Sequence, residues 1–140
     1  MYLLDTNVIS ELRKVKPHGA VLAWFRMLRP DEIAIPAVVI GEIQDGAEIT
    51  RKQDQQKATE IEAWLDYVLA NFTVLPMDGP IFREWARLTG GKSHDLSGDA
   101  MVAATARVHR LIVVTRNVKD FDGLGVEVFD PFAVAPGAQA

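Results

Sequence analysis

Short apolar segments alternate along this chain with segments of helical periodicity, and several of the apolar segments end at a polar residue. The clearest is Leu111 to Val114, a continuous aliphatic and β-branched run that is typical of a parallel strand buried on both faces. Similar runs predict strands over residues 2–4, 31–35, 73–76 and 125–129. Strands that alternate with helices predict an α/β fold, with a central parallel sheet flanked by helices.

Helical patterns fill the intervals between these strands. The strongest pattern gives one helix an apolar face made of Ile61, Trp64, Leu65, Val68, Leu69 and Phe72. Pro17 and Pro36 suit the first turns of two earlier helices, and Asp78 is predicted to cap a later one. The polar stretch 51–56 separates two predicted helices, so we expect an exposed hairpin that offers a contact for a partner or a second copy.

Length and composition limit what the chain can be. Its 140 residues, 49% of them hydrophobic, can bury one substantial core, so we expect a single domain over 1–132 and a disordered tail over 133–140. The absence of cysteine excludes disulfides, thiolate zinc sites and cysteine nucleophiles. No run reaches the roughly 18 apolar residues of a membrane span and no signal peptide is recognisable, so a cytoplasmic protein is expected.

The net charge of −4 argues against a broad basic surface for nucleic acid. If four of the 19 acids gather at one site, however, the other 15 balance the 15 Lys and Arg. Nucleic-acid binding would then depend on bound cations and a few local basic residues.

Asp5 ends the first predicted strand, and Thr6 or Asn7 is expected to cap a short helix after it. Ligands of open α/β sheets bind at the carboxyl ends of strands, where a buried acid is favoured if it holds a cation. The simpler alternative is that Asp5 only caps the helix.

Three other acids lie at comparable places. Asp99 is in the first turn of a predicted helix, Asp120 closely follows the 111–114 strand, and Glu42 lies in the helix after the second strand. Taken singly, Glu42 also fits an ordinary surface position and Asp99 an acid favoured by the helix dipole. Right-handed crossovers would bring all four acids to one edge of the sheet.

Four converging carboxylates would repel one another without a cation. Oxygen ligands suit Mg²⁺ or Mn²⁺, which bind a few carboxylates together with water and substrate phosphate. Such a site supports attack of a metal-activated water on a phosphodiester. The loop 90–95 lacks the spacing of a phosphate-binding P-loop, and His94 and Asp95 are interpreted as loop residues.

Several motifs resemble the PIN domain family, and within it the VapC-type toxin ribonucleases, from Met1 to about Pro131. These motifs are Leu4-Asp5-Thr6-Asn7-Val8-Ile9-Ser10-Glu11, Glu42, Asp99 with Ala103-Ala104-Thr105-Ala106, and Thr115-Arg116-Asn117. The resemblance implies a Mg²⁺- or Mn²⁺-dependent endoribonuclease, usually a homodimer, that acts on RNA such as tRNA or rRNA. It also implies a cognate antitoxin that occupies the active-site groove.

Carried over by position, Asp5 and Asp99 resemble the principal metal-binding acids of that family, and Glu42 the third acid. Thr115 resembles its supporting hydroxyl. Many relatives have an aspartate where this chain has Asn117, so we expect Asp120 to supply the fourth carboxylate.

Asn7 and Asn117 are expected to form hydrogen bonds within the site. The candidates for holding RNA phosphates are Arg116 and the basic turn with Arg13 and Lys14, although such a turn is also common as a solvated connection.

Three other functions are compatible with parts of the sequence. One is a PIN-type nuclease of RNA maturation or structured DNA without a toxin role, and another is an inactive PIN fold that acts only by binding a partner. The third is a phosphotransferase with Asp5 as nucleophile, but that enzyme class generally needs a second acid where Asn7 stands.

Overall fold

Five short strands form one parallel sheet in the order β3-β2-β1-β4-β5. The computed structural model describes residues 1–90 and 98–133. The strands are β1 (Tyr2–Leu4), β2 (Ile33–Pro36), β3 (Thr73–Leu75), β4 (Ile112–Val114) and β5 (Val128–Phe129). The predicted parallel sheet is therefore confirmed, with each strand starting or ending within a few residues of its expected place.

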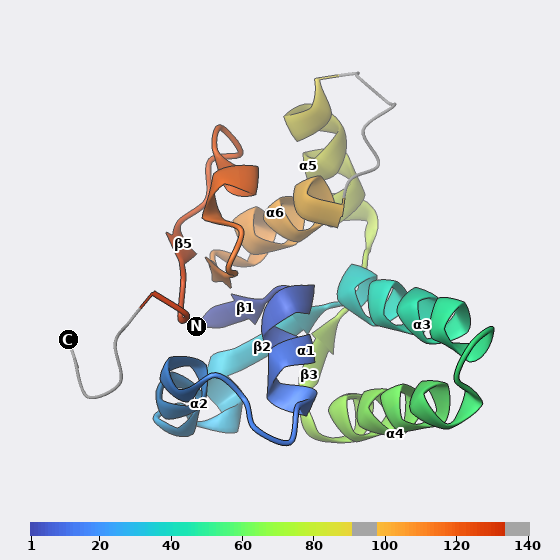
Figure 1. Ribbon diagram of the computed structural model, residues 1–140. Helices are drawn as coiled ribbons and strands as arrows, with labels where there is room; N and C mark the ends of the chain where they lie inside the picture. The colour runs from blue at the N-terminus through green and yellow to red at the C-terminus, as the bar shows by residue number, and fades with distance from the viewer. Residues whose placement is uncertain (91–97, 134–140) are drawn as a thin grey trace.

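Helices fill the connections between strands (Figure 1). They are α1 (Thr6–Arg13), α2 (Gly19–Arg26), α3 (Ala37–Arg51), α4 (Gln55–Asn71), α5 (Gly79–Thr89) and α6 (Gly98–His109), with short 3-10 turns η1 (Pro30–Glu32) and η2 (Val118–Phe121). The chain adds β2 and then β3 on one side of β1, and afterwards returns to add β4 and β5 on the other side. Right-handed crossovers therefore put α5 and α6 on the opposite face of the sheet from the earlier helices.

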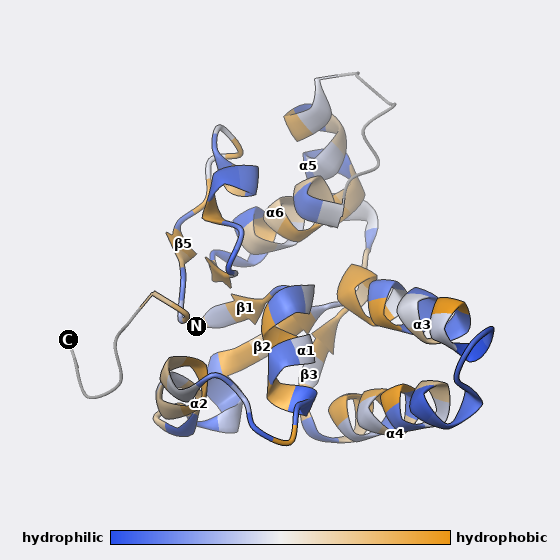
Figure 2. Ribbon diagram, in the orientation of Figure 1, coloured by the Kyte–Doolittle hydropathy of each residue, from blue (hydrophilic) through white to orange (hydrophobic). Residues whose placement is uncertain are grey.

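The core lies on both sides of the central strands. Leu3, Leu4, Ile35, Val113 and Val114 have no exposed surface, because these strands are covered on both faces. Figure 2 shows the apolar strands at the centre and hydrophilic stretches along the helices and loops around them.

One helix and one strand start later than expected. The helix predicted to open at Pro17 begins at Gly19, because His18 is its N-cap and the imidazole Nδ1 accepts a hydrogen bond from Ala20 N at 3.2 Å. Residues 30–32 form a 3-10 turn, which shortens the strand predicted from residue 31. Asp78 caps α5 as predicted, since its Oδ1 accepts from Ile81 N at 3.2 Å.

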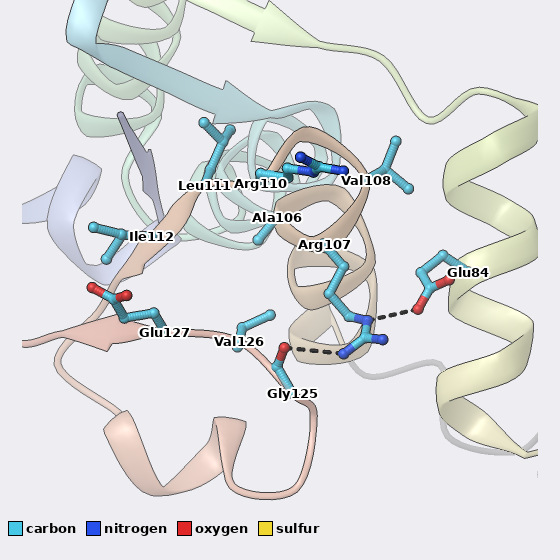
Figure 3. Close-up of a pocket in the computed structure, with 10 residues that line it drawn as sticks. All are labelled: Glu84, Ala106, Arg107, Val108, Arg110, Leu111, Ile112, Gly125, Val126 and Glu127. Atoms are coloured by element: carbon cyan, nitrogen blue, oxygen red, sulfur yellow. Dashed lines mark hydrogen bonds and ion pairs between the residues drawn. The ribbon is translucent and has the colours of Figure 1, made fainter.

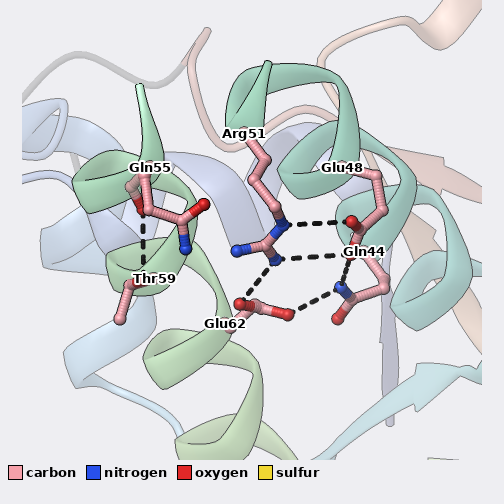
Figure 4. A network of polar contacts seen from close by, with 6 residues as sticks. All are labelled: Gln44, Glu48, Arg51, Gln55, Thr59 and Glu62. Carbon is pink, nitrogen blue, oxygen red and sulfur yellow. Dashed lines mark hydrogen bonds and ion pairs between the residues drawn. The ribbon is translucent and has the colours of Figure 1, made fainter. Parts of the chain in front are cut away.

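Helices α3 and α4 form the hairpin expected around the polar stretch. Arg51 bonds Glu48 at 3.1 Å and Glu62 at 2.7 Å, and Gln44 donates to both of these glutamates (Figure 4). This network joins the two helices across their outer surface. The predicted tail and the loop residues His94 and Asp95 lie outside the described residues, apart from Ala133.

Candidate active site

Asp5 lies where the strand order reverses. Strands β1 and β4 are neighbours, but the chain leaves them toward opposite sides of the sheet, which makes their carboxyl ends the place where open α/β sheets bind ligands. The Asp5 N–H still donates to Val114 O at 3.0 Å, so the sheet pairing continues up to the site.

Asp5 is 6% exposed, and both of its carboxylate oxygens accept hydrogen bonds. Oδ1 accepts from Thr6 N at 2.8 Å, and Oδ2 accepts from Thr115 Oγ1 at 2.9 Å. Asp5 is thus the N-cap of α1, and the prediction that Thr6 or Asn7 caps this helix is wrong. One oxygen therefore caps the helix, as the simpler alternative expected, while the other accepts from Thr115.

The charge of Asp5 is poorly compensated in the protein alone. Burial raises the pKa of its carboxyl, the hydrogen bonds from Thr6 and Thr115 oppose this, and the negative charge of Asp120 raises it further. Asp120 lies in η2, shortly after β4, and its side chain is exposed. A cation between these two acids would offset both the burial and the repulsion.

Thr115 and Asn7 fix the carboxyl end of β4 to the start of α1. Asn7 Nδ2 donates to Thr115 Oγ1 at 3.1 Å, and Asn7 Oδ1 accepts from Arg116 N at 3.0 Å. The backbone N–H of Asn117 also donates to Thr115 Oγ1, at 3.0 Å. The structure thus brings together all three residues expected to support the site.

Glu42 and the start of α6 approach the same region from the neighbouring helices. Glu42 Oε1 accepts from Thr6 Oγ1 at 2.6 Å, next to Asp5. Its other oxygen lies against Gly98, where an added Cβ would come within 2.5 Å of Oε2. Asp99 follows Gly98 in the first turn of α6, so the four acids predicted from the sequence belong to one end of the sheet.

Within the described ranges, no three acidic or histidine side chains are placed closely enough to hold one ion by themselves. The donors are nevertheless those of a hard divalent cation, because every side chain gathered here offers oxygen. Mg²⁺ keeps several of its waters and needs only one or two protein carboxylates. The residues present therefore fit such an ion.

The predicted basic residues have different surroundings. Arg13 lines a groove of about 380 Å³ together with Thr6 and Glu42. Lys14 forms an ion pair with Glu11 at 2.9 Å, and the Arg116 guanidinium lies 4.5 Å from the centre of the Phe132 ring. Arg13 thus shares a groove with Glu42, an acid of the site.

Two further residues of the groove were missed by sequence reasoning. Thr6 was considered only as a cap, although its hydroxyl holds Glu42. Lys57 also lines the groove, but it lies in the first turn of α4, where the sequence carries no signal for the site.

A separate cavity of about 420 Å³ lies at the other end of β4 (Figure 3). Arg107 crosses it, bonding Glu84 Oε2 at 2.6 Å and the carbonyl oxygen of Gly125 at 3.0 Å. Because these contacts satisfy the guanidinium and none of the four acids lines this cavity, we assign it a structural role.

Comparisons with known proteins agree with this geometry. Residues 2–125 match the PIN domain. Toxin FitB of Neisseria gonorrhoeae is 31% identical over 94% of this chain and 99% of its own length, and VapC ribonuclease Y4jK of Sinorhizobium fredii is 34% identical over 96% and 100%. The crystal structure of FitAcB from Neisseria gonorrhoeae superposes with a TM-score of 0.81 at 30% identity, covering 95% of this chain and 99% of that one.

Proposed function

This chain belongs to the PIN domain family, and we propose that it is a metal-dependent endoribonuclease that acts as the toxin of a toxin–antitoxin pair. The relatives named as toxin or ribonuclease extend over nearly the whole chain, so the proposal concerns the complete domain. The observation that carries it is the buried Asp5 carboxylate at the sheet's switch point, with the charge of Asp120 acting on it and Glu42 held beside it.

We assign metal binding to Asp5, Asp99, Asp120 and Glu42, with Mg²⁺ or Mn²⁺ as the ion. When bound, the cation supplies a polarised water and positive charge for phosphodiester hydrolysis. Thr115 and Asn7 orient Asp5 through the hydrogen bonds described above. Thr6 orients Glu42, so both carboxylates are held in place before substrate arrives.

The partners proposed are RNA, a cognate antitoxin and a second copy of the chain. A toxin–antitoxin complex from Klebsiella pneumoniae superposes at a TM-score of 0.67 with 27% identity, which supports the antitoxin as a partner. An antitoxin that covers the acids would block cleavage by excluding RNA from them. No helix in residues 1–90 or 98–133 is both long and apolar enough to cross a membrane.

Cleavage of a mixed set of transfer and ribosomal RNAs by the purified, antitoxin-free chain tests the proposal. We expect discrete cleavage with Mg²⁺ or Mn²⁺, none with EDTA, and a loss of about a hundredfold or more in Asp5→Asn and Asp99→Asn. Asp31→Asn is the matched control, because Asp31 is exposed in η1 and pairs only with Arg29 among the described residues. Cleavage that persists in EDTA or in both site variants would overturn the mechanism.

The toxin role needs a separate measurement. Expression of the wild-type chain should arrest bacterial growth, while Asp5→Asn should not. A chain that cleaves RNA in vitro but leaves growth unaffected would be a nuclease of RNA maturation instead.

A further inference from the structure

The groove that contains Glu42 continues away from the acids between α1, α3 and α4. Its wall is formed by Thr6, Ser10, Arg13, Glu42, Ile43, Gly46, Thr50, Lys57 and Ile61. An adjoining hollow of about 200 Å³ shares Arg13 and Lys57 and adds Asp54, Gln56 and Glu60. The groove therefore leads from the acid site toward two basic side chains.

Neither Arg13 nor Lys57 forms an ion pair with another described residue, which sets them apart from their neighbours. Arg51 on the same hairpin is neutralised by Glu48 and Glu62, and Lys14 by Glu11. In the groove itself, as distinct from the adjoining outer hollow, Arg13 and Lys57 share the wall with a single carboxylate, that of Glu42. This stretch of the wall therefore has an excess of positive charge in a protein whose net charge is −4.

Two acids, Asp54 and Glu60, lie near these cations but line only the outer hollow. Asp54 is the N-cap of α4, and its Oδ1 accepts from Lys57 N at 3.0 Å. A lysine in the first turn of a helix is also disfavoured by the helix dipole. An anionic ligand would therefore stabilise the charged Lys57 side chain.

We propose that this groove binds the sugar-phosphate backbone of single-stranded RNA beside the cleavage site, with Arg13 and Lys57 contacting a flanking phosphate. The inference rests on the proposed nuclease function. Arg13 lies seven residues along α1 from Thr6, which is roughly 10 Å at 1.5 Å per residue. The two cations are therefore suited to a neighbouring phosphate, while the acids hold the scissile one.

The size and lining of the groove favour a single strand. Clefts of 300–1,000 Å³ typically hold drug-sized ligands, so about 380 Å³ accommodates one or two nucleotides and not a duplex. Ser10 and Thr50 add hydroxyl groups along the wall, which suit phosphate and ribose oxygens. These contacts involve the RNA backbone and not the bases, so they would strengthen RNA binding without conferring sequence specificity.

Salt-dependent binding of a short, labelled single-stranded RNA of mixed sequence tests the proposal. The full chain with Asp5→Asn is the background, so that the RNA is not cut. We expect Lys57→Gln or Arg13→Gln to reduce the slope of log affinity against log salt by about 0.7, and the double variant by about 1.4. Each single change should weaken binding about three- to fivefold at low salt.

Lys52→Gln is the charge-matched control, because Lys52 is exposed on the same hairpin and lines neither hollow. It should leave the slope unchanged. Equal slopes in the Lys52, Lys57 and Arg13 variants would overturn the groove proposal, whether or not the wild-type chain cleaves RNA.

Filling the groove gives a second test that changes no charge. A Cβ added at Gly46 meets no atom within 4 Å, so Gly46→Ala should fold, and urea unfolding checks that Gly46→Leu is folded as well. Gly46→Leu should weaken RNA binding about tenfold while Gly46→Ala does not, because only leucine extends into the groove. Equal RNA affinity of the two variants would contradict the proposal.

A cleavage assay distinguishes failure of the groove proposal from failure of the nuclease function on which it rests. In the otherwise unchanged chain, Lys57→Gln should raise KM for RNA while kcat stays within about twofold. If the wild-type chain cuts no RNA but the binding slopes still fall as expected, the groove stands and the nuclease function does not.

Discussion

Thr115 occupies a central position among the polar contacts of the site. Its side chain is completely buried, and the hydroxyl donates to Asp5 while accepting from Asn7 and from the backbone of Asn117. One hydroxyl thus joins the ends of two strands that are more than a hundred residues apart in the sequence. Its loss would remove one hydrogen bond each from the buried Asp5 carboxylate, from Asn7 and from the backbone of Asn117.

Replacing Thr115 with valine keeps the shape and removes the hydroxyl. We expect Thr115→Val to lower the free energy of unfolding by about 1–3 kcal/mol, because the buried Asp5 carboxylate loses the hydrogen bond from the hydroxyl. Thr115→Ser restores the hydroxyl and should recover most of the metal affinity lost in the valine variant. Urea unfolding measures the loss of stability and Mn²⁺ titration the loss of metal affinity. Equal metal affinity in the valine and serine variants would contradict a role of the Thr115 hydroxyl in positioning Asp5.

Glu11 stabilises the turn between α1 and α2 in a pH-dependent way. Its carboxylate accepts from Lys14 Nζ and from His18 N, each at 2.9 Å. The contact with Lys14 lowers the pKa of this carboxyl, burial opposes the shift, and the His18 bond adds to it. Because the pKa is lower in the folded state, the stabilisation is present above the unfolded pKa and is lost as the pH falls through the folded value.

Glu11→Gln should therefore lower the free energy of unfolding by about 1 kcal/mol at neutral pH. The difference from the wild type should shrink below about pH 4, where the glutamate itself becomes protonated. Urea unfolding at both pH values checks this, with exposed Glu60→Gln as the control. A difference that stays constant with pH would show that the charge of Glu11 is unimportant.

At the scale of elements, the close approach of α3 and α6 positions Glu42. Gly98 is the first residue of α6, and any side chain there would collide with the Glu42 carboxylate. Because the carboxylate is the end of a flexible chain, it can move aside without disturbing the helices. A glycine at this point therefore serves the site more than the fold.

Gly98→Ala should displace Glu42 and reduce RNA cleavage about tenfold or more, with the free energy of unfolding changed by less than about 1 kcal/mol. Gly79→Ala is a matched control, since Gly79 begins α5 and a Cβ there meets nothing within 4 Å. Cleavage rates and urea unfolding of the two variants give the answer. Full activity of Gly98→Ala would contradict the proposed role of Glu42.

At the scale of the whole molecule, stability and the site are coupled through Asp5. Its raised pKa means that its charge costs stability as the pH rises through the folded pKa, and a bound cation removes that cost. Mn²⁺ at a hundred times its dissociation constant should stabilise the fold by about 2.7 kcal/mol and raise the Tm.

Asp5→Asn should remove this metal-dependent rise in Tm while the metal-free protein stays folded. Thermal unfolding with Mn²⁺ and with EDTA measures both states. Asp31→Asn is again the control and should respond to Mn²⁺ as the wild type does. An equal Mn²⁺ shift in Asp5→Asn would place the ion elsewhere.

The sequence itself determined the α/β class, because periodicity and β-branched runs act locally. It also identified Asp5 and Asp99 as candidates, since the end of a strand and the first turn of a helix are recognisable in short segments. The roles expected of Glu42 and Thr115 came from the resemblance to the PIN domain family. The cap of α1 was misjudged because Asp5 accepts from Thr6 N with one oxygen while its other oxygen accepts from Thr115, and the sequence does not reveal this division.

Only the tertiary structure decided which distant groups meet. The return of the chain across β1 creates the switch point, and it alone brings Thr115 to Asp5 and Gly98 to Glu42. The position of Lys57 was also not predictable from its local sequence. Nothing there indicates that α4 folds back beside α1, so that Lys57 shares a groove with Arg13. Local propensity selects the elements, whereas packing and crossover direction select the neighbours on which the chemistry depends.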